Sequence, residues 1–143
     1  MKREDTVDHH IKSTWHAVYR MYNQQAVKND FTTTIGFVLL NINSKEGTPA
    51  TKIAPMMGLE SRSLTRMLKS MEEKNLIYRA KDPNDGRSVR IFLTELGIEK
   101  KEISRLTVLN FNEEVRGKID PIKLQTFFEV IGKINKVIDK KQF

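Results

Sequence analysis

Two short stretches of the sequence concentrate cationic and hydrogen-bonding side chains at a spacing that suits nucleic-acid binding. The first runs from Ser61 to Lys69, and the second is the turn DPNDGR at residues 82–87. Arginine can form two hydrogen bonds with guanine, whereas serine and threonine more often hold phosphates. These residue types favour the hypothesis that both stretches contact duplex DNA.

The candidate DNA-binding residues come from one predicted helix and one predicted hairpin. They are Ser61, Arg62, Ser63, Thr65, Arg66 and Lys69 on the helix, and Arg79, Lys81, Asp85, Arg87 and Arg90 on the hairpin. Free N–H groups at a helix N-terminus attract phosphate, and the minor groove attracts arginine. We expect Asp85 to pair with Arg87 and fix its direction, and Arg90 to meet adjacent phosphates. The alternative is a solvated helix face and a surface turn, whose exposed ion pairs contribute roughly 0–1 kcal/mol.

The charge balance points to the same part of the chain. The net charge is +7, and residues 51–94 hold nine basic and five acidic side chains. A localised basic excess suits a polyanionic partner, although many basic proteins bind no nucleic acid.

A helix has to position the first stretch, and apolar spacing predicts one from Ser61 to Lys74. Its buried stripe is Leu64, Met67, Leu68 and Met71. We expect Asn75 to end it in a left-handed conformation. A shorter helix before it extends to about Met57, with Thr48 as N-cap and Pro49 as its first residue. Gly58 allows the tight turn between the two helices.

A hairpin has to position the second stretch. Residues 76–81 and 88–94 are rich in β-branched and aromatic side chains and flank the turn, in which Asp82 can cap the backbone. One tiny extra strand is expected near Thr48. Two helices joined by a turn and followed by a hairpin predict a winged helix-turn-helix.

Further helices flank this lobe. We expect them at residues 7–27, 33–43, from the cap Thr94 to about Arg116, and from Pro121 onward. The last helix gathers apolar residues on one side, namely Leu124, Phe127, Phe128, Ile131, Ile134 and Ile138. The predicted fold class is mainly α with a small β-hairpin.

Several classes of protein are disfavoured. The chain has no cysteine, which excludes disulfides and zinc–thiolate sites. No apolar run approaches the roughly 18 residues that span a membrane, and the charged N-terminus lacks a secretion signal, so we expect a soluble cytoplasmic protein. No catalytic triad, phosphate-binding loop, dinucleotide fingerprint or metal-ligand motif is visible, which predicts neither an enzyme nor a cofactor. The only histidines, His9, His10 and His16, do not suggest a metal site.

The segment SRSLTRMLKSMEEKNLIYRAKDPNDGRSVRIFLTELG, residues 61–97, resembles the MarR (multiple antibiotic resistance regulator) family of bacterial transcription factors. The family's wing signature is matched here by Asp85, Arg87, Val89, Ile91, Leu93, Thr94 and Gly97. Gly86 stands where many members have a basic residue, and Asn75 stands where many have glycine.

The resemblance implies a dimeric winged-helix regulator that binds pseudo-palindromic operators, with Ser61–Lys69 in the major groove and Arg87 in the minor groove. It implies one domain over residues 1–143. Residues 1–30 and 95–143 would supply dimerisation helices, and residues 31–94 the DNA-binding lobe. The apolar pattern alone also suits a monomeric core.

The resemblance further implies repression relieved by a small aromatic effector, for which Trp15, Tyr19 and Phe37 are the candidate residues. Aromatic side chains at helical spacing are more often core residues. The competing function is a winged-helix adaptor that binds protein and not DNA. Such an adaptor should carry apolar or acidic residues on the outward side of Ser61–Lys69, whereas that side here holds cationic and hydroxyl side chains.

Overall fold

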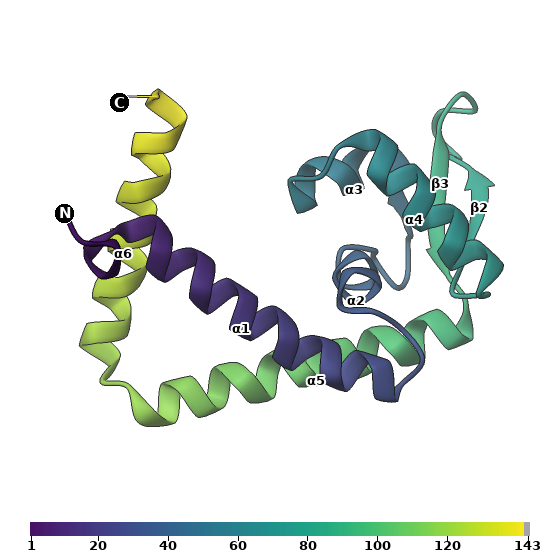
Figure 1. Cartoon of the computed structure of the whole chain (residues 1–143). Coiled ribbons are helices and arrows are strands. Elements are labelled where there is room, and N and C mark those ends of the chain that lie inside the picture. The colour runs from purple at the N-terminus through teal and green to yellow at the C-terminus, as the bar shows by residue number, and fades with distance from the viewer. Residues whose placement is uncertain (142–143) are drawn as a thin grey trace. The chain divides into compact units, whose positions relative to one another are not determined.

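The computed structural model describes residues 1–141, and these residues form helices with one small antiparallel sheet (Figure 1). A short 3-10 helix, Arg3–Asp5, precedes α1. The chain divides into two compact units, Met1–Thr107 and Val108–Phe143. The first unit contains the hydrophobic core, the sheet and every candidate DNA-binding residue.

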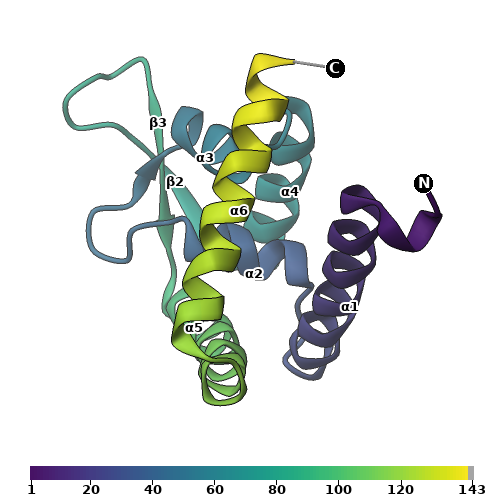
Figure 2. The same ribbon diagram turned by 90° about the vertical axis from the view of Figure 1, so that its left-hand side faces the viewer.

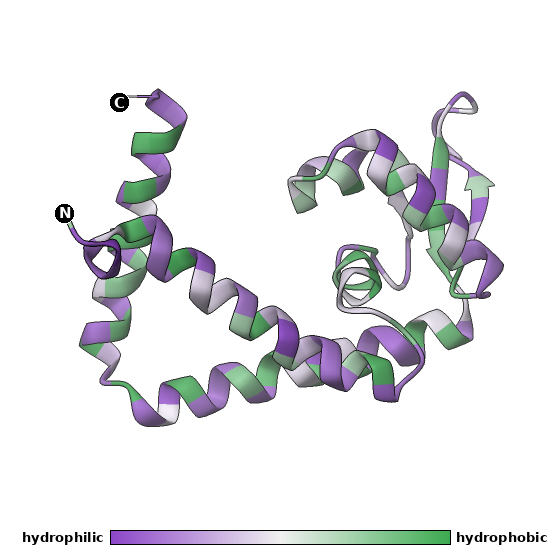
Figure 3. Ribbon diagram, viewed as in Figure 1, coloured by the Kyte–Doolittle hydropathy of each residue, from purple (hydrophilic) through white to green (hydrophobic). Residues whose placement is uncertain are grey.

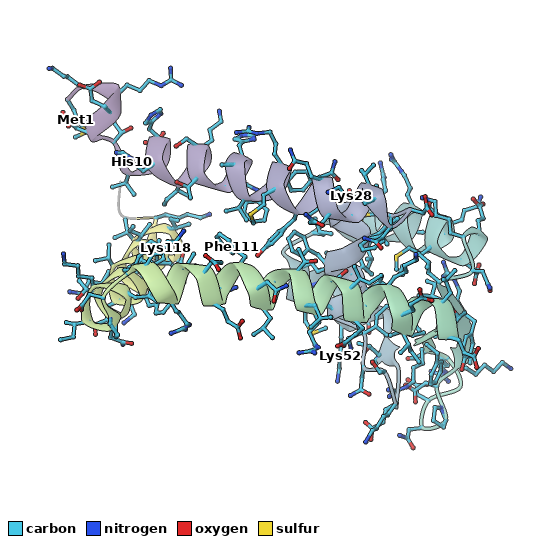
Figure 4. The ribbon with its side chains drawn as sticks, turned by 90° about the horizontal axis from the view of Figure 1, so that it is seen from below. Met1, His10, Lys28, Lys52, Phe111 and Lys118 are labelled. Atoms are coloured by element: carbon cyan, nitrogen blue, oxygen red, sulfur yellow. The ribbon has the colours of Figure 1, made fainter. Side chains whose placement is uncertain are left out.

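The order of elements agrees with the predicted fold class. The elements are α1 (Val7–Lys28), α2 (Thr33–Leu40), β1 (Thr48–Pro49), α3 (Ala50–Met57), α4 (Ser61–Glu73), β2 (Ile77–Lys81), β3 (Val89–Leu93), α5 (Glu95–Lys118) and α6 (Pro121–Lys140). Helix α1 is one continuous helix, with His10 near one end and Lys28 at the other (Figure 4). No helix among the described residues is long and apolar enough to cross a membrane.

Two local predictions are wrong. Thr48 does not cap α3, because it lies in β1 and pairs with Ile91, while Pro49 occupies the N-cap position. The Thr48 hydroxyl instead accepts a hydrogen bond of 2.9 Å from the backbone N–H of Asn43. Helix α2 ends at Leu40, three residues before the predicted end, and Asn41 is its C-cap.

The core lies between α2, α3, α4 and the inner face of the sheet. Its fully buried side chains are Val38, Leu39, Ile42, Ile53, Met71, Ile77 and Ile91. Helix α4 contributes Leu64, Leu68 and Met71 to it, and Met67 packs at its edge, so the predicted stripe is the buried face. Burial of this stripe turns the polar face of α4 outward.

The sheet has the strand order β1-β3-β2, with antiparallel neighbours. Ile77 pairs with Leu93 and Lys81 pairs with Val89, and the turn between these strands projects away from the helices (Figure 2). We call β2, β3 and their connecting turn, residues 77–93, the wing.

The wing is joined to its neighbouring helices by tight connections. Asn75 has the predicted left-handed conformation, with φ of 60°, between α4 and β2. After β3, the Thr94 hydroxyl accepts a hydrogen bond of 3.0 Å from Gly97 N–H, as expected of a helix cap. A β-carbon added at Gly97 would overlap the backbone oxygen of Leu76, so the start of α5 lies directly against the entry to β2.

The second unit contains the end of α5 and α6. The Asp120 side chain caps α6 by accepting hydrogen bonds from the N–H groups of Ile122 and Lys123. Within the described part of α6 only Leu124 is buried, while Phe127, Phe128 and Ile138 are exposed. Apolar and polar residues alternate in blocks along this helix (Figure 3).

Candidate nucleic-acid interface

The polar face of α4 is available to a ligand. Ser61, Arg62, Ser63, Thr65, Arg66 and Lys69 are all exposed. Within residues 1–141, no ion pair engages Arg62, Arg66 or Lys69. The N-cap residue Glu60 makes no side-chain hydrogen bond to the first turn, whose N–H groups therefore lack a side-chain acceptor. This end of α4 combines backbone N–H donors with exposed cationic side chains.

The turn of the wing is fixed by two aspartates. Asp82 Oδ1 accepts a hydrogen bond of 2.8 Å from Asn84 N–H, which is the cap expected from the sequence. Asp85 accepts from the backbone N–H of Arg87 at 3.0 Å and from the Ser88 hydroxyl at 3.2 Å. The expected Asp85–Arg87 ion pair is therefore replaced by a bond to the backbone, and the Arg87 side chain is exposed.

Two further cations lie on β2. Lys81 is exposed at the end of the strand beside the turn. Arg79 forms an ion pair with Glu72 of α4, with 3.4 Å between Nε and Oε2. Because both side chains are partly exposed, this pair contributes only about 0–1 kcal/mol to stability. It also offsets part of the positive charge that Arg79 would present to DNA. The pair links the wing to α4, and the sequence prediction did not include it.

Arg90, which the sequence predicted to meet phosphates, is engaged by groups of the protein itself. Its side chain is 19% exposed and donates from Nε to Asp82 Oδ2 at 3.2 Å, while its Nη1 donates to the backbone oxygens of Glu46 at 3.1 Å and Gly47 at 3.4 Å. The Asn84 N–H and, secondly, the Arg90 charge hold the pKa of Asp82 below its ordinary value. Arg90 thus connects the base of the wing to the chain before β1.

A lysine that sequence reasoning missed holds the other end of the same chain segment. Lys101 Nζ on α5 donates to the Ile42 backbone oxygen at 2.6 Å and to the Ser44 hydroxyl at 3.1 Å. Burial lowers the pKa of Lys101. No local pattern could have revealed this contact, because its partners lie almost sixty residues earlier.

The three candidate effector residues meet on one side of α1 and α2. Trp15 stacks on Phe37 with ring centroids 6.1 Å apart and lies edge-on to Tyr19 at 6.1 Å. The Tyr19 hydroxyl bonds the Thr34 hydroxyl at 3.0 Å. Tyr22, seven residues after Trp15 and therefore on the same helix face, also contacts Phe37, and burial raises its pKa. Trp15 remains 49% exposed.

The described residues contain no cluster of three or more histidines and carboxylates able to hold a metal ion. The candidate nucleic-acid interface comprises the outer face of α4 and the wing. Both belong to the first compact unit, and the Arg79–Glu72 ion pair joins α4 to β2 of the wing.

Comparisons with known proteins give consistent similarities. The sequence model described as "MarR family" matches residues 31–89. The HTH-type transcriptional regulator SarZ of Staphylococcus aureus (strain USA300) is 31% identical over 97 residues, which cover 67% of this chain and 66% of SarZ. The chain thus aligns with slightly less than two thirds of that relative's length.

Solved structures show the same fold. The S. aureus MepR–DNA complex has a TM-score of 0.84 at 20% identity and covers 92% of this chain and 97% of MepR. The PcaV regulator of Streptomyces coelicolor, solved with its natural ligand, has a TM-score of 0.80 at 17% identity and covers 96% and 97%. Streptococcus pneumoniae FabT in complex with DNA has a TM-score of 0.80 at 12% identity and covers 95% and 97%. At these identities the likeness establishes the winged-helix fold.

Proposed function

The chain belongs to the MarR family, and on this premise we propose that it is a sequence-specific regulator of transcription that binds double-stranded DNA. The observation that carries the proposal is the exposed cationic face of α4, which no ion pair within residues 1–141 engages at Arg62, Arg66 or Lys69, together with the exposed Arg87. A winged-helix adaptor for proteins would need apolar or acidic residues on that face.

Each polar residue has a distinct role in this proposal. The first turn of α4, Ser61–Ser63, binds phosphate through its N–H groups and hydroxyls, and Arg66 lies on the outward face where it can reach a guanine edge. Arg87 enters the minor groove, and Lys81 meets phosphate. Arg79 contributes less, because Glu72 shares its charge.

Two copies of the chain would act together. Helix α1 exposes Val7, Ile11 and Trp15, and α6 exposes Phe127 and Phe128, which a second copy can cover. We assign residues 1–30 and 95–143 to dimerisation and residues 31–94 to the DNA-binding lobe. Two-fold symmetry then requires a pseudo-palindromic operator with half-sites about one DNA turn apart.

Regulation would be repression relieved by a small aromatic molecule. The half-exposed ring of Trp15, with Tyr19 and Phe37 beside it, offers stacking surfaces and a hydroxyl for such a ligand. Trp15 is the only tryptophan of the chain. Titration with salicylate should therefore quench the protein's intrinsic fluorescence in a saturable way and weaken operator binding. Linear, unsaturable quenching would argue against an aromatic effector.

The test of DNA binding starts with selection of bound fragments from the source genome. Fluorescence anisotropy then compares a selected fragment with random DNA across salt concentrations. We expect Arg66→Ala to lose about 1–3 kcal/mol of discrimination between the two, and Arg87→Ala to lower the salt slope by about one.

Lys28→Ala, which removes the same charge from the end of α1, is the matched control and should leave discrimination unchanged. Equal binding of every fragment, or no binding, would favour the adaptor. If Arg66→Ala lowered the affinity for the selected fragment and for random DNA equally, Arg66 would be a phosphate contact and not a base contact.

A further inference from the structure

The segment 42–47, which connects α2 to β1, is held near both of its ends by cations that the proposed DNA contacts do not use. Arg90 of β3 binds the backbone oxygens of Glu46 and Gly47, and Lys101 of α5 binds the backbone oxygen of Ile42. All of these residues lie within the unit Met1–Thr107. We call the segment 42–47 the bracket loop.

Internal hydrogen bonds connect the two ends of the bracket loop. Asn43 Oδ1 accepts hydrogen bonds of 2.9 Å from the N–H groups of both Lys45 and Glu46. Gly47 N–H donates to the Asn43 backbone oxygen at 3.0 Å. Gly47 has φ of 67°, and a β-carbon there would come within 2.6 Å of the Ile91 backbone oxygen. The loop therefore lies tightly against β3.

Arg90 also reaches the wing turn from the same guanidinium. Its Nη2 lies 3.2 Å from Asp82 Oδ2, and the Asp82 side chain is only 9% exposed. Asp82 in turn fixes Asn84, and Asp82 N–H donates to the Ser88 backbone oxygen at 3.0 Å. The contacts thus run without interruption from α5 through the bracket loop and Arg90 to the turn that carries Arg87.

We propose that Arg90 and Lys101 are positioning residues that fix the wing to α5 through the bracket loop and so hold Arg87 where it meets DNA. This inference rests on the proposed DNA-binding function. Neither residue contacts DNA in it. Their contribution is preorganisation, because a wing that occupies its binding position for only about one tenth of the time binds about tenfold more weakly.

Asp82→Asn distinguishes an effect of wing position from an effect of charge, because the two would change the affinity for DNA in opposite directions. Removal of a negative charge beside the proposed DNA contacts would tighten binding through electrostatics alone. An asparagine at position 82 whose side-chain oxygen accepts the hydrogen bond from Asn84 N–H would turn its NH2 group toward the Arg90 guanidinium. Because both groups are donors, the contact with Arg90 would be lost. We expect Asp82→Asn to weaken operator binding about tenfold with an unchanged salt slope.

Anisotropy titrations with the selected operator fragment would measure Asp82→Asn, Arg90→Ala and Lys101→Met. Lys100→Met, which removes the neighbouring charge on α5, is the matched control for Lys101→Met and should bind as the wild type apart from a small charge effect. Tighter binding by Asp82→Asn, or a salt slope in Arg90→Ala that falls as in Arg87→Ala, would overturn the proposal and make Arg90 a phosphate contact.

Amide hydrogen exchange in the free proteins keeps this inference separate from the proposed function. We expect Arg90→Ala and Lys101→Met to accelerate exchange at the Asp82 and Ser88 N–H groups and to leave the core N–H of Leu76 protected. Unchanged exchange at Asp82 and Ser88 would overturn the bracket even if DNA binds. Faster exchange at these two sites in the variants, together with a wild-type protein that binds no DNA, would retain the bracket and reject the proposed function.

Discussion

Gly97→Ala should severely destabilise the protein, although alanine is the better helix former. Gly97 is the third residue of α5, and a β-carbon there would overlap the backbone oxygen of Leu76 and lie 3.4 Å from a methyl carbon of Leu93. The obstructing atom belongs to the backbone and cannot rotate away. Leu76 O also accepts the hydrogen bond of 3.1 Å from Thr94 N–H, which any displacement would strain.

The expected loss of unfolding free energy is the sum of two destabilising contributions and one stabilising contribution. Overpacking against a fixed neighbour costs roughly 3 kcal/mol, at the upper end of the usual range. Loss of the Thr94–Leu76 hydrogen bond costs about 1 kcal/mol. Replacement of glycine by alanine in a helix returns about 1 kcal/mol. The net loss is therefore about 3 kcal/mol, which lowers the melting temperature of a chain of this size by roughly 10 °C.

Thermal unfolding followed by circular dichroism, at one fixed protein concentration, measures this difference. Gly117→Ala is the matched control, since it makes the same change near the other end of α5, where nothing lies within 4 Å of the added carbon. We expect that control to be neutral or more stable by up to about 1 kcal/mol. A Gly97→Ala protein as stable as the wild type would refute the argument that close approach of α5 to β2 requires glycine.

Three further predictions follow from other contacts. Thr94→Ala removes the cap of α5 and should lower the free energy of unfolding by about 1–2 kcal/mol in urea titrations, whereas Thr94→Ser should retain most of it. The pKa of Asp82 is lower in the folded protein than its ordinary value of 3.8, so ionised Asp82 stabilises the protein fully above pH 3.8 and loses that contribution as the pH falls through the lowered pKa. Urea unfolding measured as a function of pH should show that Asp82→Asn lacks this part of the loss of stability in acid. Phe128→Lys should shift the proposed dimer to monomer in sedimentation velocity, with a dissociation constant raised about tenfold or more, and an unshifted dimer would remove α6 from the interface.

Local patterns in the sequence were sufficient where the determinants are local. The stripe containing Leu64 and Leu68 predicts α4 because the spacing of its apolar residues is set within one helix, and these apolar residues are the ones that α4 buries. The two strands of the wing were predicted because a turn rich in Pro, Asn, Asp and Gly separates two β-prone segments. The predicted cap at Thr94 likewise depends on a residue only three positions away.

Two of the errors arose where partners are distant in sequence, and a third arose within a single turn. Thr48 has the residue type of an N-cap, but its strand partner Ile91 lies in β3 and overrides that preference. Arg90 looks like a solvent-facing cation within the hairpin, but two of its acceptors, on Glu46 and Gly47, lie 44 and 43 residues earlier. Asp85 was expected to bind the Arg87 side chain, but its own turn offers nearer backbone and hydroxyl donors.

The short strand β1 also protects the sheet from association with other chains. With the order β1-β3-β2, the two outer edges belong to β1 and β2. One edge is only two residues long and ends in Pro49, which has no N–H to offer an incoming strand. The other carries Arg79 and Lys81, whose charges disfavour stacking of like chains. The protein can therefore expose a projecting hairpin without offering a template for amyloid-like growth.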